Sequence, residues 1–153
     1  MRKIGLLLSI LVVSMACGGG GGGASLTGPR GPSRTVIAHG TAQLGDPLTA
    51  LSQGRLCDVF AFVPFTTSAQ GTLDATVDWT LASNDIDLHL ERGDCNCALV
   101  QTGACQDLAS AESTTAKPEK LTVSAFSAGS YTLVVVNAGL GRESASYEVG
   151  LTR

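Results

Sequence analysis

The sequence predicts an all-β domain, an antiparallel β-sandwich or jelly roll of about eight strands. Three observations predict this fold class. Apolar and polar residues alternate with period two in several short segments, turn-forming Gly, Pro, Asn and Asp residues separate those segments, and no segment has a convincing helical period. The domain is expected over residues 34–153, which is enough chain to form one hydrophobic core.

Ile86, Leu88 and Leu90 give the clearest alternation and are expected to face the core, with the acidic residues between them facing outward. Residues 131–136 are apolar on both faces, which predicts a strand in the middle of a sheet. A short helix is expected at residues 46–51. The expected strands are residues 34–39, 56–63, 72–79, 85–90, 98–102, 120–123, 131–136 and 146–151.

The N-terminal segment has the pattern of a secretory signal peptide. Arg2 and Lys3 precede an apolar run over residues 4–13, which is too short to span a bilayer as a stable helix. Residues 18–33 are dominated by Gly, Ser and Pro and cannot bury enough apolar surface to fold, so they are expected to form a flexible tether. The expected organisation is therefore a signal peptide over 1–16, an anchor and tether over 17–33, and one domain over 34–153.

Residues 13–17, Val-Ser-Met-Ala-Cys, resemble the lipobox of bacterial lipoproteins, although Ser14 stands where that family usually has Leu. The resemblance implies cleavage before Cys17 and lipidation of its thiol, which anchors the protein in a membrane. Gly18 follows the cysteine where an Asp favours inner-membrane retention in Gram-negative lipoproteins, and this implies the outer membrane of the bacterial cell envelope. Export without an anchor is the alternative.

The formal net charge of the whole chain is −3, and removal of Arg2 and Lys3 with the signal peptide makes it more acidic. A mildly acidic chain without a basic cluster is a poor partner for nucleic acid or anionic lipid. Its expected partners are the membrane, through the anchor, and a protein or glycan, with the domain itself a monomer.

Four cysteines remain besides Cys17, namely Cys57, Cys95, Cys97 and Cys105, and in an exported domain they are expected to form two disulfides. A bond between Cys95 and Cys97 would close a very tight, strained loop. The favoured pairing is Cys95–Cys105 with Cys57–Cys97, and the swapped pairing remains an alternative. Zinc binding by the thiolates is less favoured, because export favours oxidation and the cysteines have no close histidine partner.

Four segments resemble, in order and spacing, the strands of bacterial pre-peptidase C-terminal domains. They are residues 56–62 (LCDVFAF), 84–90 (NDIDLHL), 128–135 (AGSYTLVV) and 144–149 (SASYEV). The resemblance covers about residues 35–153 and implies a β-sandwich, without catalytic residues, that accompanies secreted proteases and other surface proteins. Some relatives bind calcium or extracellular matrix. His89 stands where the family more often has an aromatic residue, and the cysteines are outside its general pattern.

Asn84, Asp85 and Asp87 are candidate calcium ligands, because calcium prefers oxygen ligands from closely spaced acidic and amide side chains. The competing explanation is that the aspartates cap neighbouring turns and solvate the outer face of a strand. Residues 92–94, Arg-Gly-Asp, match an integrin-type adhesion tripeptide, but a turn with Gly at its tight position explains these residues better.

No catalytic motif such as G-x-S-x-G or H-E-x-x-H is present, so the chain is not expected to be an enzyme. Trp79, Tyr131 and Tyr147 lie on apolar faces and are expected in the core, whereas Phe65 follows Pro64 and is expected to be exposed. The expected function is a non-catalytic binding or accessory module that contacts its ligand through loops. The alternatives are a calcium-dependent adhesion or matrix-binding module and a small secreted hydrolase.

Overall fold

The computed structural model describes residues 31–153, so the predicted signal peptide, Cys17 and most of the predicted tether lie outside the described residues. Within this range neither α-helix is long and apolar enough to cross a membrane. The strands are β1 (Arg34–Leu44), β2 (Phe60–Thr67), β3 (Gly71–Trp79), β4 (Ile86–Arg92), β5 (Gln106–Ala111), β6 (Glu119–Phe126), β7 (Gly129–Asn137) and β8 (Glu143–Thr152). The helices are α1 (Pro47–Ser52), α2 (Cys97–Thr102) and the 3₁₀ turn η1 (Leu56–Val59).

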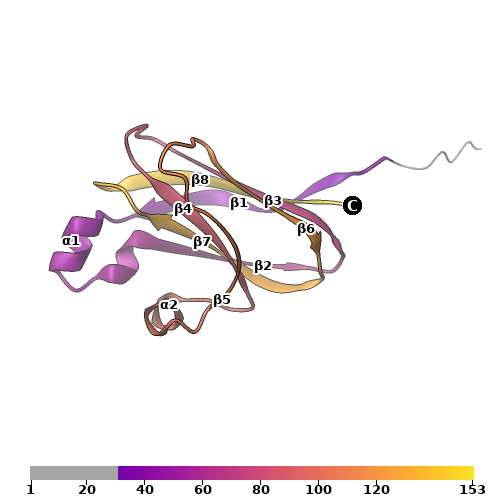
Figure 1. Ribbon diagram of the computed structural model, residues 1–153, viewed down its shortest axis with the longest axis horizontal. Coiled ribbons are helices and arrows are strands. Elements are labelled where there is room, and N and C mark those ends of the chain that lie inside the picture. Colours follow the sequence, from indigo (N-terminus) through magenta and orange to yellow (C-terminus); the bar gives the residue numbers. More distant parts are fainter. Residues whose placement is uncertain (1–30) are drawn as a thin grey trace, which may run out of the picture. The chain divides into compact units, whose positions relative to one another are not determined.

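The strands form two four-stranded antiparallel sheets, with the orders β1-β8-β3-β6 and β2-β7-β4-β5 (Figure 1). Every connection between consecutive strands crosses from one sheet to the other, except the one from β4 to β5. This is the arrangement of a jelly roll, in which two sheets pack face to face. The predicted fold class is confirmed.

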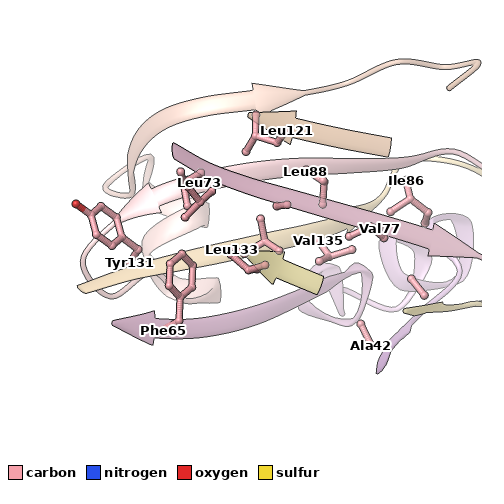
Figure 2. Packing of buried hydrophobic residues seen from close by; sticks show 14 of the residues in the cluster. Ala42, Phe65, Leu73, Val77, Ile86, Leu88, Leu121, Tyr131, Leu133 and Val135 are labelled. Atoms are coloured by element: carbon pink, nitrogen blue, oxygen red, sulfur yellow. The ribbon is translucent and has the colours of Figure 1, made fainter. Parts of the chain in front are cut away.

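The core lies between the two sheets, and alternate residues of each strand supply it. Ile86, Leu88 and Leu90 on β4 are fully buried, as predicted. Leu133 and Val135 lie beside them on the neighbouring strand β7 and are also fully buried. Figure 2 shows Ile86, Leu88, Leu133 and Val135 together with side chains of the opposite sheet, Leu73 and Val77. Burying a side chain of this size stabilises the fold by about 1.5–3 kcal/mol. β7 pairs with both β2 and β4, so the prediction of a central strand at 131–136 is correct.

The predicted strand at residues 98–102 is wrong, because this segment forms α2. The side chain of Asn96 accepts a hydrogen bond from the backbone N–H of Leu99, which caps the first turn, and Gly103 ends the helix in the left-handed conformation with φ 66°. The strand is instead β5, a few residues later, which pairs with the edge of β4. Its sequence, QDLASA, is mostly small and polar and therefore lacks the apolar row that predicts a strand.

Three further expectations have different outcomes. The first half of the strand predicted at 56–63 is the turn η1, and the helix predicted at 46–51 is confirmed as α1. Phe65, predicted to be exposed, is buried and stacks on Tyr131 with 5.9 Å between ring centroids. Alternation places Phe65 on the inner face of β2, and this outweighs the effect of the preceding proline because Pro64 lies on an edge strand and points outward.

The structure contains two disulfides, Cys57–Cys97 and Cys95–Cys105, which is the pairing favoured from the sequence. Cys57–Cys97 fastens the connection between β4 and β5, which carries α2, to η1, and Cys95–Cys105 closes this connection on itself. In Figure 1, α2 lies on the side of the sheet β2-β7-β4-β5 that faces away from the other sheet. The backbone N–H of Cys95 donates to the hydroxyl of Thr132 on β7, so the connection is also held against the sheet it covers.

We expect removal of the two disulfides to have unequal effects on stability. Replacing both cysteines by alanine should lower the free energy of unfolding by about 4 kcal/mol for Cys57–Cys97 and about 3 kcal/mol for Cys95–Cys105, because these bonds span sequence separations of 40 and 10 residues. Urea denaturation of the mature protein measures both losses. A larger loss for the short loop would contradict the chain-entropy argument.

Candidate functional site

Four connections meet at one end of the sandwich, which we call the loop end: residues 45–59, 80–85, 112–118 and 138–142. Three of them, 45–59, 80–85 and 138–142, together with the adjoining ends of β1 and β8, enclose an open depression of about 750 Å³, the loop-end depression. Its walls carry the partly exposed ring of Phe60, the exposed Leu81, and the guanidinium groups of Arg55 and Arg142. The volume lies within the range of about 300–1,000 Å³ that is usual for ligand sites.

Glu143 fixes one wall of the depression. Its buried carboxylate accepts hydrogen bonds from the backbone N–H groups of Thr80 (3.0 Å), Leu81 (3.1 Å) and Ser144 (2.9 Å), and from the side-chain amide of Asn84 (3.3 Å). Burial alone raises the pKa of Glu143, but these four hydrogen bonds outweigh it, and the pKa is lowered. The carboxylate therefore stays ionised and ties the connection after β3 to the start of β8.

Asn137 joins two of the connections that border the depression. Its buried side-chain amide donates to the carbonyl groups of Gly45 (2.8 Å) and Gly141 (2.7 Å), which belong to two different connections. Asp46 caps α1 through the N–H of Leu48 (3.1 Å). These contacts set the distance between the walls of the depression without using its exposed side chains.

The charges around the depression are only partly paired. Arg55 forms an ion pair with Asp58 at 2.9 Å, whereas Arg142 is exposed and has no acidic partner among residues 31–153. The carboxylate of Glu143 is saturated by its own hydrogen bonds. Arg142 therefore offers a guanidinium fork to an external group.

Phe60 belongs to a pair of aromatic rings on the outer face of β2. The rings of Phe60 and Phe62 are 5.9 Å apart between centroids and inclined by 28°, and both are partly exposed. Trp79 and Tyr131 are buried and Tyr147 is partly buried against the core, as predicted for these three aromatic residues. Phe60 is thus the aromatic side chain that lines the depression.

The loop-end depression continues over the outer face of the sheet β1-β8-β3 as a shallow sheet groove. Two hollows of about 320 and 590 Å³ make up this groove, and Thr41, Asp78 and Ser146 line both of them. Thr80 and Ser144 line both the smaller hollow and the depression. The groove exists because the outward residues of β8 at its centre, Ser144 and Ser146, are small.

The residues proposed as calcium ligands lie near the loop end, and one of them, Asn84, has other partners. Asn84 is buried, and its side-chain oxygen accepts from the N–H of Asp85 at 3.1 Å and lies where a β-carbon on Gly139 would clash. Asp85 and Asp87 are half-buried, and one side-chain oxygen of Asp85 has no hydrogen-bond partner. Over residues 31–153 no group of three or more His, Cys, Asp or Glu side chains lies close enough together to hold a metal ion. Calcium binding stays a prediction.

Asp87 lies in an acidic environment on the outer face of β4. Burial, and then the charges of Asp85 and Glu112, raise the pKa of Asp87 to about 6, although nearby His89 lowers it in part. Glu91, two strand positions beyond His89, is buried, and its pKa is also raised by burial and by Asp107. This face therefore carries negative charge that the fold does not compensate.

The Arg-Gly-Asp tripeptide lies at the end of β4, where Gly93 has a positive φ of 75°. Arg92 lies over the ring of Tyr131, 5.8 Å from its centroid, and Asp94 is exposed. The segment starts the connection to α2, so it forms a turn after the strand but not a tight hairpin between β4 and β5. Its use in adhesion stays untested.

The depression itself was missed as a site by sequence reasoning. Arg142 and Leu81 lie in segments recognised only as turns, and Glu143 has no motif around it. The available signal is the presence of exposed leucines in turn segments, at Leu81 and Leu140, where polar residues are usual.

The described residues form a disulfide-linked β-sandwich of the jelly-roll type, and the two disulfides indicate a location outside the cytoplasm. No protein-family model and no curated protein matches the sequence. In structure the chain is similar to the Yersinia pseudotuberculosis-derived mitogen (YPM), with a TM-score of 0.51 over 75% of this chain and 85% of that chain, at 14% sequence identity. This likeness shows the fold alone. The resemblance to pre-peptidase C-terminal domains stays a prediction beyond the shared sandwich.

We expect Glu143→Gln to lower the free energy of unfolding by about 2 kcal/mol at neutral pH, because it weakens several charged hydrogen bonds in a buried place. The lowered pKa means that this contribution is full above the unfolded value near 4.5 and is lost as the pH falls through the folded value. Denaturation at neutral and at acid pH should therefore show a difference that shrinks in acid. Glu148→Gln, an exposed carboxylate paired with Arg34, is the control and should change stability little.

We expect Asp87→Asn to stabilise the protein by about 1 kcal/mol at pH about 8, after discounting the shift for solvent screening of this half-buried group. Because the folded pKa of about 6 lies above the ordinary value of 3.8, ionisation of Asp87 opposes folding. Stability of the wild type should rise as the pH falls through 6 towards 3.8, and the variant should lack part of this rise.

The same variant tests the calcium hypothesis. Calcium held by Asp85 and Asp87 would raise the melting temperature of the wild type at millimolar concentration and would not raise that of Asp87→Asn. An unchanged wild-type melting temperature would reject the hypothesis.

Proposed function

We propose that the chain is a lipid-anchored protein of the bacterial cell envelope that displays a non-catalytic β-sandwich binding module, with the loop-end depression as its binding face. Cleavage before Cys17 and lipidation of this residue provide the anchor, and residues 18–33 act as the tether that lifts the domain off the membrane surface. The absence of Asp after the lipidated cysteine favours the outer membrane. The disulfides support export.

The observation that carries the proposal is the way in which the loop end is built. Buried Glu143 and Asn137 hold three connections at fixed distances, so that the partly exposed Phe60 and the exposed Leu81 and Arg142 are presented on a rigid frame. A preformed hollow with an aromatic ring, an apolar side chain and an unpaired guanidinium is typical of a ligand site. An accessory role beside a secreted enzyme, as in pre-peptidase C-terminal domains, is consistent with this face.

The arrangement of the carboxylates at the depression supports binding in preference to catalysis. Asp58 is paired with Arg55. Glu143 has a lowered pKa, so its carboxylate is ionised and has no proton to donate. A hydrolase of the paired-carboxylate type needs one acid whose pKa is raised. Glu143, whose pKa is lowered, does not serve as that acid.

Leu81→Glu should weaken binding of the mature chain, prepared without its acyl groups, to isolated bacterial envelopes at least about tenfold, because it places a charge on a wall of the depression. The matched control is Leu108→Glu, an equally simple change of an exposed leucine on β5 away from the depression, which should bind like the wild type. Equal binding by both variants and the wild type would overturn the proposal.

Mass spectrometry of the native protein tests the cleavage site and the lipid anchor. We expect a mass that corresponds to a chain starting at Cys17 with acyl groups attached, and membrane fractionation that is lost in Cys17→Ser. An unprocessed chain that begins at Met1 would contradict the lipid anchor.

A further inference from the structure

We infer that the loop-end depression binds an oligosaccharide that bears a carboxylate, with the acid group on Arg142 and the neighbouring sugar units along the sheet groove. This inference rests on the proposed function and names the ligand class of the same site. It follows from four features of the surface: a free guanidinium, an aromatic ring, a groove lined by hydroxyl groups, and the pairing of the groove's own charges.

The carboxylate is assigned to Arg142. Several other basic residues already have partners: Arg34 pairs with Asp74 and Glu148, Arg55 with Asp58, and Lys117 with Asp78. Arg142 lacks such a partner within residues 31–153 and stands at the rim of the depression. A guanidinium binds a carboxylate through two parallel N–H···O bonds, which gives orientation as well as affinity.

The sugar character follows from the groups around that guanidinium. Phe60 presents a partly exposed ring, and the negative face of an aromatic ring attracts the C–H groups on one side of a sugar. Gln43 and Ser144, which hydrogen-bond to each other at 2.9 Å, and the hydroxyl of Thr80 line the same hollow. Amide and hydroxyl side chains both donate and accept, as the hydroxyl groups of a sugar require.

The sheet groove extends the site in one direction. Its length along β8 from Ser144 to Glu148 is about 13 Å, at about 3.3 Å for each residue of a strand. Its two carboxylates are already paired, Asp78 with Lys117 at 2.7 Å and Glu148 with Arg34 at 2.8 Å, so the groove does not repel an uncharged chain of sugar units. The unpaired acidic groups around Asp87 disfavour a long polyanion elsewhere on the domain.

A peptide is a poorer fit for this groove. Extended peptides bind by adding main-chain hydrogen bonds to the free edge of a sheet. The groove instead crosses the face of β1, β8 and β3, where the main-chain groups of β8 are used by ladders on both sides. The surface therefore offers side-chain groups, which suit a sugar, and no row of main-chain partners.

Calorimetric titration of the mature protein with four saccharides tests the inference. Trigalacturonate and sialyllactose are the acidic probes, and methyl-esterified trigalacturonate and lactose are their uncharged counterparts. At least one acidic probe should bind about tenfold more tightly than its counterpart, which corresponds to one charged, bidentate contact. Arg142→Gln should abolish this preference without changing binding of the uncharged counterpart. Lys120→Gln should keep it and is the control, because Lys120 is exposed and forms no ion pair with residues 31–153.

Phe60→Leu should weaken both acidic and uncharged probes, because it keeps an apolar side chain but removes the ring. Failure of both acidic probes to bind at millimolar concentration would overturn the ligand class, as would equal binding of each acidic probe and its counterpart. Tighter binding of a triglutamate peptide through Arg142 would replace the saccharide by an acidic peptide. Loss of envelope binding in Leu81→Glu would then still support the proposed function, so the two failures are distinguishable.

Discussion

The structure depends on one constraint, the dry interface between two sheets that each present every second side chain to the other. The inward rows of β4 and β7 are fully buried, and those of β3 and β8 meet them from the opposite sheet. Because a shift of one residue in a strand such as β4 would turn its apolar row towards solvent, this interface fixes the register of such strands. The exposed side chains of the candidate site lie on the outer faces and in the connections.

The loop end shows how a sandwich of this kind positions a site without exposing its core. Glu143 and Asn137 are polar residues at the last buried level of the sandwich, and both use their side chains on main-chain groups of the connections. A buried carboxylate is tolerated there because its hydrogen bonds replace the water it has lost. The hydrogen bonds of these buried residues make the connections rigid, and the outward side chains of the connections remain available to a ligand.

Sequence reasoning predicted the layers of the fold but not the site, and the reason is physical. Alternation is a local property, so the inward positions of Ile86, Leu88 and Leu90 are evident from a few residues. Segment 98–102 and β5 were misjudged because a cap at Asn96, a left-handed Gly103 and the pairing of a polar edge strand override weak local patterns. The depression joins residues such as Phe60 and Arg142 that are distant in sequence, and no local pattern reports their meeting.

The likeness to the Yersinia mitogen shows why function must be argued from the depression and not from the fold. At 14% sequence identity the two chains meet the same alternation constraint with different residues. The constraint acts on inward positions, and any apolar side chain of suitable volume satisfies it. The alternation constraint does not act on outward positions. Three features of the site are therefore properties of this chain and not of the fold: the unpaired guanidinium of Arg142, the hydrogen-bonded carboxylate of Glu143 and the small residues along β8. A different set of outward residues on the same sandwich would select a different ligand.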